Sequence, residues 1–172
     1  NYYNVNLSDA NDYGINHANS THWLIQNKIS GVDADIEDCI DDGIIVIGAH
    51  GNYNMKITAN TSDPDYNNYL SDGSTDFYAK GGSPTNSPGA ISVGSIYKAY
   101  TGGTNRNDAK AFYSNKGDRV DIWAPGSMIQ SSVHSGGIAD DRDSDYYITQ
   151  YSGTSMASPQ VAGIVACLVG VY

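Results

Sequence analysis

Apolar and polar stretches alternate along the 172 residues of this chain and predict strands and helices in turn. Residues 44–47 are four β-branched residues in succession, with no polar residue among them. Such a run is typical of a strand that is buried on both faces, inside a parallel sheet. Residues 90–96 read as the next buried strand, and residues 3–8 as a strand near the start of the chain. We therefore expect a parallel sheet in the interior of the protein.

Two segments have the pattern of helices. Residues 33–42 carry acidic residues in the first turn, and Gly43 follows the last turn. Their apolar residues Ile36, Cys39 and Ile40 recur at helical spacing and form the expected inward stripe. The second helix lies at the end of the sequence and is almost wholly apolar. Because strands and helices alternate, we expect the α/β class, with a doubly wound, mostly parallel sheet flanked by helices.

Polar stretches separate these elements. Residues 53–89 are rich in Asn, Asp, Ser and Gly and read as an extended surface loop, and residues 102–109 read as another. Further on, residues 130–133 and 147–152 have the pattern of strands on either side of an acidic loop at 136–145. No internal repeat and no linker divides the sequence, so a single domain is expected.

The composition excludes several function classes. A net charge of −10 and a pI near 4.4 argue against nucleic-acid binding, which needs a basic surface. No apolar run is long enough to span a bilayer, so no membrane partner is expected. Cys39 and Cys167 are too few for a disulfide framework and are expected as free, buried thiols. We expect a protein that is extracellular, or associated with a surface or a virion.

The most informative stretch begins at Gly153 and reads GTSMASPQVAG. Gly153 allows a sharp turn into the last helix, Thr154 can cap that helix, and Ser155 places a hydroxyl in its first turn. The free N–H groups of a helix N-terminus would stabilise an oxyanion that forms at Ser155. A single serine at this place would be read as a helix cap. Seven consecutive residues of this kind favour a catalytic nucleophile instead.

This stretch resembles the nucleophile motif of the subtilisin-like serine peptidases, the subtilases, with Gln160 where many members have histidine. Residues 43–52 resemble the buried strand of that family that ends in A-x-G-N, and residues 111–126 resemble its F-S-x-x-G and A-P-G block. The three segments occur in the expected order. The resemblance implies that Ser155 is the nucleophile of a serine endopeptidase and that the Asn52 side chain is a catalytic donor of the oxyanion hole.

The resemblance also implies that a catalytic Asp and a catalytic His stand in segments before the Asn strand, in D-[ST]-G and H-G-T-H motifs. Neither motif occurs in this sequence. None of the four histidines has that context: His17, His22, His50 and His134. A serine hydroxyl needs a general base, so the chain alone is expected to be nearly inert. We expect residues 1–172 to be a partial subtilase catalytic domain that requires an N-terminal segment bearing the Asp and the His as its partner.

Substrate-binding residues follow from the resemblance alone. A peptide or protein substrate would pair in extended form with the backbone near residues 7–9, and pockets would select its side chains. The expected walls of the primary pocket consist of Leu7, Ser8, Asp9, Ala49, His50 and Gly51. The ring of His50 either lines the substrate cleft or points to solvent, and we do not expect it to be the base. A turn of many members also implies a cis bond before Pro84.

Two alternatives remain open. Asp141, Asp143 and Asp145 alternate as Ca²⁺ ligands would, and a second acidic loop holds Asp63, Asp65, Asp72 and Asp76. Acidic loops are more often solvated surface than metal sites, so no cofactor is required and structural Ca²⁺ is the alternative. For function, the alternative is a non-catalytic subtilase-like module, retained for a larger assembly such as a surface layer, a filament or a virion.

Overall fold

The computed structural model describes residues 4–5, 29–54, 56–63, 69–71, 76–78, 82–101 and 105–171. The helices are α1 (Ser30–Asp41) and α2 (Thr154–Val169). The strands are β1 (Asn4–Val5), β2 (Ile47–Ala49), β3 (Tyr69–Ser71), β4 (Asp76–Tyr78), β5 (Ile91–Thr101), β6 (Asn105–Lys110), β7 (Ile122–Pro125), β8 (Ile129–Val133), β9 (Ile138–Asp140) and β10 (Asp143–Tyr151).

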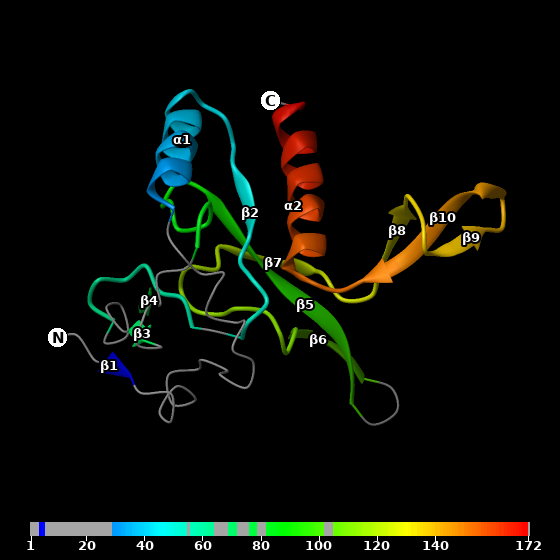
Figure 1. Ribbon diagram of the computed structural model, residues 1–172, viewed down its shortest axis with the longest axis horizontal. Coiled ribbons are helices and arrows are strands. Elements are labelled where there is room, and N and C mark those ends of the chain that lie inside the picture. The colour runs from blue at the N-terminus through cyan, green and yellow to red at the C-terminus, as the bar shows by residue number, and fades with distance from the viewer. Residues whose placement is uncertain are drawn as a thin grey trace.

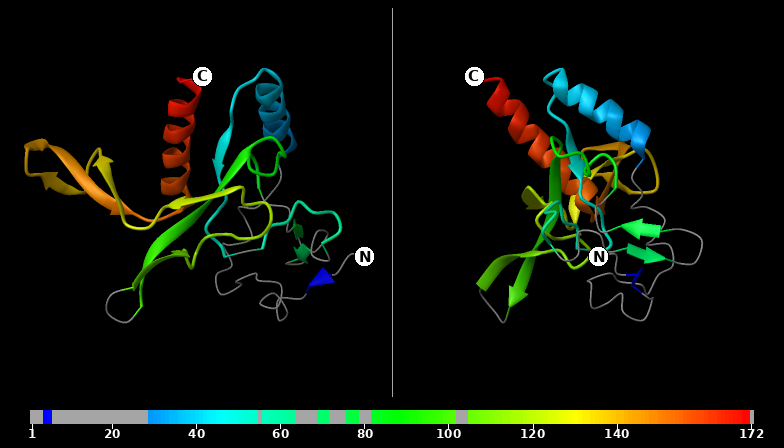
Figure 2. Two further views of the ribbon diagram at one scale, coloured as in Figure 1. Left: turned by 180° about the vertical axis from the view of Figure 1, so that it is seen from behind. Right: turned by 90° about the vertical axis from the view of Figure 1, so that its left-hand side faces the viewer.

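A parallel sheet forms the centre of the protein, with β5 between β2 and β7 (Figure 1). Ile47 of β2 pairs with Ile91 of β5, and Ile122 of β7 pairs with Val93 of β5. The second half of β5 continues beyond β2 and pairs with β6 in an antiparallel hairpin. In Figure 1 and in the left-hand view of Figure 2, β2 lies between α1 and α2. The α/β class, with helices flanking a largely parallel sheet, is therefore confirmed.

The core lies between this sheet and α2, which packs across β2, β5 and β7. Its buried members are Val93, Ala124, Ala157 and Val161, with Ile47, Ile91 and Val165 packed around them. Ala157 and Val161 are one helical turn apart and so face the sheet together. A Cβ on Gly126 would lie 3.1 Å from the Cβ of Ala157, so the small residues allow a close approach. This packing fixes where α2 begins.

The first helix agrees with its prediction but begins earlier, at Ser30. The expected stripe residues Ile36, Cys39 and Ile40 are all half-buried. A Cβ on Gly89 would lie 3.0 Å from two atoms of Ile40, which shows how closely α1 covers the turn before β5. α1 therefore packs through the side that the sequence indicates.

The buried run at residues 44–47 is only partly a strand. β2 begins at Ile47, and Ile44 and Ile45 are 55% and 50% exposed. The N–H of Ile44 donates to the carbonyl of Cys39 and so belongs to the turn that ends α1. The chain joins the sheet only where the carbonyl of Val46 accepts from the N–H of Ile91. The expectation of burial was wrong for the first two residues of the run.

Three expected loops contain strands. Residues 105–110 form β6, although their side chains are mostly polar, because the extended backbone pairs with β5. The long polar stretch contains β3 and β4, and β3 also pairs with β1, part of the expected strand at 3–8. The acidic loop contains β9, and it is flanked by β8 and β10, the two strands expected there. Backbone pairing accounts for these differences, and the side-chain pattern does not report it.

β8, β10 and β9 form an antiparallel sheet that projects away from the central sheet (Figure 1). We call residues 129–151 the arm. β10 leads directly through Ser152 and Gly153 into α2, so the arm and the last helix are joined by a very short connection. The arm therefore branches from the protein beside the predicted nucleophile.

Several smaller expectations also have an outcome. The bond between Ser83 and Pro84 is cis, as expected. Both cysteines are free, but Cys167 is exposed and Cys39 only half-buried, so their burial was overestimated. Neither described helix has the length and apolar character that a membrane crossing requires.

Candidate functional site

Ser155 is exposed in the first turn of α2. Gly153 is the N-cap and Thr154 is the first helical residue, so the expectation that Thr154 caps the helix was wrong. The N–H of Gly153 donates to the carbonyl of Gly126 at 2.8 Å, which anchors the turn before the helix. A Cβ on residue 153 would lie 3.2 Å from Nδ2 of Asn52, so glycine leaves room for that side chain.

The side chain of Asn52 supplies the cap that Gly153 lacks. Its Oδ1 accepts from the backbone N–H of Thr154 at 2.8 Å and from the Thr154 hydroxyl at 2.9 Å. Oγ1 of Thr154 in turn accepts from the N–H of Gly51 at 3.1 Å. One of the free N–H groups of the helix N-terminus is thus satisfied from the segment after β2. The structure brings Asn52 to the residue that precedes Ser155.

The expected substrate-binding residues divide into two groups. Ala49 ends β2 and Gly51 follows at a φ of 101°, a left-handed conformation that favours glycine, and both are half-buried. Leu7, Ser8 and Asp9 lie outside the described residues, so their roles stay predictions.

His50 is buried, with 3% of its surface exposed. Its Nδ1 forms a hydrogen bond with the hydroxyl of Ser92. Burial, assisted by the positive charge of Arg119, lowers the pKa of His50 to about 4, against the opposing effects of Asp121 and the Lys116 backbone. The imidazole is therefore neutral at neutral pH, and it does not point to solvent. A substrate-binding role for His50 stays a prediction.

Arg119, close enough to affect the charge of His50, is buried, and no sequence motif selects it. Arg119 donates through Nη1 to Oδ2 of Asp121 at 2.6 Å and through Nη2 to the carbonyls of Ser87 and Ala90, each at 2.7 Å. Oδ2 of Asp121 also accepts from the N–H of Ser92. These bonds join the turn before β5 to the turn before β7.

Tyr113 supports the turn that anchors the nucleophile. Its hydroxyl donates to the carbonyl of Gly126 at 2.9 Å, and it also bonds the hydroxyls of Ser95 and Ser127, each at 2.8 Å. The same Gly126 carbonyl accepts from Gly153. Tyr113 lies within residues 111–126, the block selected by its resemblance to the family, but nothing in the sequence indicates a role for its phenol.

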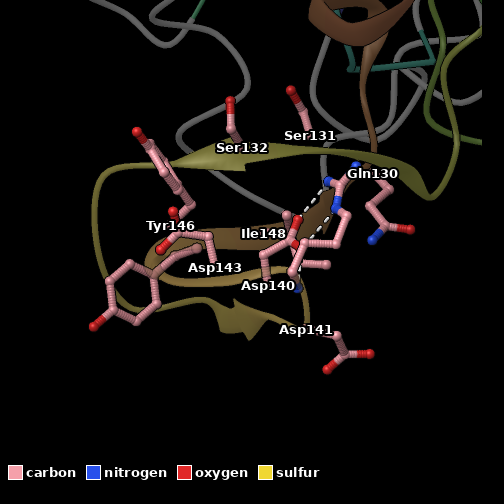
Figure 3. A pocket seen from close by; sticks show the side chains of 10 residues that line it. Gln130, Ser131, Ser132, Asp140, Asp141, Asp143, Tyr146 and Ile148 are labelled. Carbon is pink, nitrogen blue, oxygen red and sulfur yellow. Dashed lines mark hydrogen bonds and ion pairs between the residues drawn. The ribbon is translucent and has the colours of Figure 1, made fainter.

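A hollow of about 940 Å³ lies on the arm (Figure 3). Its lining consists of Gln130, Ser131, Ser132, Asp140, Asp141, Arg142, Asp143, Tyr146, Tyr147 and Ile148. Asp140 binds Arg142 through both carboxylate oxygens, at 2.8 and 2.6 Å, and this pairing holds the pKa of Asp140 well below its usual range. Neither Ser155 nor Asn52 contributes to this hollow.

The acidic loops do not assemble into a metal site within the described part of the chain. Among those residues, no three His, Cys, Asp or Glu side chains lie close enough together to hold a metal ion. Asp65 and Asp72 lie outside the described residues. Structural Ca²⁺ therefore stays a prediction.

Curated relatives are proteases. The chain is 31% identical over 154 residues to an extracellular protease of Xanthomonas campestris pv. campestris, a match that covers 90% of this chain and 25% of that protein. It is 39% identical over 93 residues to subtilisin-like protease 2 of Trichophyton verrucosum, covering 54% of this chain and 18% of that protein. The chain thus spans about a quarter or less of the length of these relatives.

Solved structures show the same likeness. A cold-adapted subtilisin-like serine proteinase matches 85% of this chain and 39% of its own, with a TM-score of 0.52 and 25% identity. A protease of Pseudoalteromonas arctica matches 82% of this chain and 34% of its own, with a TM-score of 0.53 and 26% identity. The sequence pattern of the Subtilase family matches residues 7–172. With Asn52 bound to the start of the helix that carries Ser155, and with these matches, the chain belongs to the subtilase family.

Proposed function

We propose that this chain supplies the nucleophile and the oxyanion hole of an extracellular serine endopeptidase. The observation that carries the proposal is the pair of hydrogen bonds from Thr154, the residue before Ser155, to Oδ1 of Asn52. Because Oδ1 is occupied, the Nδ2 group is the end of the amide that is left to donate to a substrate. An exposed serine at a helix N-terminus beside an oriented amide suits acyl transfer.

In the proposed reaction, Oγ of Ser155 attacks the carbonyl carbon of a peptide bond, and the carbonyl oxygen takes up the negative charge. Nδ2 of Asn52 and the backbone N–H of Ser155 donate to that oxygen, and the helix N-terminus favours the charge. Collapse of the tetrahedral intermediate expels the amine and leaves an acyl-enzyme on Ser155, which water then hydrolyses. Loss of one such side-chain donor in a subtilisin costs about 10²- to 10³-fold in kcat.

The reaction requires a general base, which neither described histidine supplies. His50 is buried against Ser92, and His134 is exposed on the arm. We assign the base and its orienting carboxylate to a further segment of the subtilase domain, outside residues 1–172. The low coverage of the relatives supports this assignment, because a large part of each relative has no counterpart in this chain.

The second half of α2 is the proposed seat of that segment. The apolar side chains of Ile164, Leu168 and Val169 on α2 are exposed. Covering one such side chain stabilises a complex by about 1.5–3 kcal/mol. A segment that bears the Asp and the His and covers these side chains would complete both the packing of α2 and the site.

Substrate and location follow from the same proposal. The substrate is a polypeptide bound in extended form, with its main chain paired near residues 7–9 and its side chain directed between them and residues 49–51. The relative from Xanthomonas campestris is named an extracellular protease, which supports an extracellular location for this chain.

Fluorophosphonate labelling of the full-length protein tests the proposal, because the probe reacts with an activated serine. We expect a mass-spectrometric adduct on Ser155 and none in Ser155→Ala, whereas Ser158→Ala, one turn further into α2, still labels. An unlabelled Ser155 in folded protein that contains the Asp and His segment would contradict a working peptidase. That result would favour the alternative, a structural module of a larger assembly.

A further inference from the structure

We propose that Asn115 is a positioning residue that aims the Asn52 side chain. Asn115 has no exposed surface and lies in the turn after β6. Its Nδ2 donates to the carbonyl of His50 at 2.7 Å, and its Oδ1 accepts from the N–H of Tyr53 at 3.0 Å. Its backbone N–H donates to the carbonyl of Gly51 at 2.9 Å. This inference rests on the proposed function, since it gives Asn52 its role.

The three bonds bracket Asn52 in the sequence. Two of them hold the residues before Asn52 and one holds the residue after it, while Asn52 itself is exposed. On the other side, Thr154 accepts from the N–H of Gly51 and donates to Oδ1 of Asn52. The backbone that carries Asn52 is therefore fixed between two buried side chains, Asn115 and Thr154.

Beyond His50, whose N–H still donates to the carbonyl of Val93 on β5, no regular ladder performs this task at residues 51–53. β2 ends at Ala49, and Gly51 has a φ of 101°, so the chain leaves the sheet before it reaches Asn52. Backbone groups in such a turn need partners from outside the turn. Asn115 supplies an acceptor for one N–H and donors for two carbonyls, which replaces the ladder.

Asn115 is itself held rigidly. The hydroxyl of Ser114 donates to the carbonyl of Asn115 at 3.0 Å and accepts from the N–H of Ser95 on β5. Nζ of Lys110 donates to the carbonyls of Ala111 and Ser114 at 2.8 and 2.9 Å. The turn that presents Asn115 is therefore fastened to β5, the middle strand of the central sheet.

The bonds at both ends of the side chain explain why the residue is asparagine. An aspartate keeps the acceptor for Tyr53 but loses the donor, and it sets a carboxylate oxygen against the carbonyl of His50. A displacement of the segment by about 1 Å suffices to cost about 100-fold in rate, because the oxyanion donor must meet the developing charge. The side chain of Asn115 touches no substrate in this scheme and acts through Asn52.

A double-mutant cycle in the full-length protease tests this coupling. We expect Asn115→Asp to lower kcat by about 10- to 100-fold with KM changed by less than about twofold. We expect Asn52→Ala to lower kcat by about 10²- to 10³-fold, and the double variant to be no slower than Asn52→Ala alone. Ile40→Val, in α1 where the side chain covers Gly89 before β5, serves as the control that loosens packing away from Asn52 and multiplies equally with both backgrounds.

A second measurement keeps the inference testable if the peptidase proposal fails. In NMR spectra of the full-length protein, Asn115→Asp should shift the Asn52 side-chain amide signals, whereas Ile40→Val should leave them unchanged. Unchanged Asn52 signals, or losses in kcat that multiply in the double variant, would overturn the positioning role. A wild-type protease without activity but with the expected NMR changes would reject only the proposed function.

Discussion

The two halves of α2 differ in composition and in surroundings, because residues 154–161 include Thr, Ser and Gln whereas residues 162–169 are apolar throughout. In the first half, Thr154, Ala157 and Val161 are buried, and the first backbone N–H is bonded to Asn52. In the second half, Leu168 and Val169 are 55% and 61% exposed. A helix that is apolar on all sides is typical of a buried position, so the second half has the composition of an element that needs further cover. Within this chain, the polar connections of the site are more complete than its hydrophobic burial.

The largest expected effect is at the first turn of the helix. Ser155→Ala should lower kcat of the full-length protease by about 10⁶-fold, the size found when the nucleophile of a subtilisin is removed. The free energy of unfolding should change little, because Ser155 is exposed. Peptide hydrolysis and urea unfolding check the two parts. A variant that retains even a hundredth of the activity would place the nucleophile elsewhere.

The second effect is a loss of stability in acid, caused by the buried His50. Its pKa is lowered to about 4, whereas the unfolded chain titrates near 6.5. Between these values the unfolded state binds a proton that the folded state does not, so stability is full above about pH 6.5 and falls as the pH decreases toward 4. We expect a loss of up to about 3 kcal/mol, measured by urea unfolding at pH 7 and at pH 4.

His50→Gln provides the matched control, because it keeps a polar side chain and removes the titration. Its stability should depend less on pH over that interval than that of the wild type. Equal pH dependence in the two proteins would show that His50 does not cause the acid sensitivity.

The third effect tests how tightly the first half of α2 is packed. Val161→Ala removes buried methyl groups from the core and should lower the free energy of unfolding by about 2 kcal/mol. Thermal or urea unfolding of this chain measures the change. A loss below about 0.5 kcal/mol would mean that even the first half of α2 is loosely packed.

The smallest effect is expected in the second half. Leu168→Ala should change the stability of this chain alone by less than about 0.5 kcal/mol, because the side chain is already exposed. With the segment that bears the Asp and the His in place, the same change should cost about 2–3 kcal/mol. Unfolding of the chain and of the full-length protein gives the comparison. Equal small costs in the chain and in the full-length protein would show that the segment does not cover α2.

The sequence predicted the elements whose own side chains determine them. Residues 153–163 marked the start of α2, and residues 33–42 marked most of α1, because capping, turn and apolar spacing are local properties. The run at 44–47 was misread in part, since the backbone of Ile44 serves the end of α1. Polar β6 was missed because its stability comes from pairing with β5.

The same limit applied to the candidate site, where local motifs were predicted but contacts between distant segments were not. Asn52 and Ser155 could be selected from motifs, but the bonds of Asn52 to Thr154 depend on how two distant segments meet. Asn115 lay within a recognised block without a role, because a buried asparagine and a surface asparagine look alike in sequence. Only the positions of the His50 carbonyl and the Tyr53 N–H distinguish them.

The hydrogen bond between Asn52 and Thr154 also determines when the site can exist during folding. Its partners are separated by 102 residues, so it forms only after β5, β7 and the arm, which lie between them in the sequence, have folded. Closing so long a loop is entropically costly, and contacts of this kind form late in folding. A partly folded chain therefore has the serine without the bond between Asn52 and Thr154, and the candidate site is assembled only together with the native state.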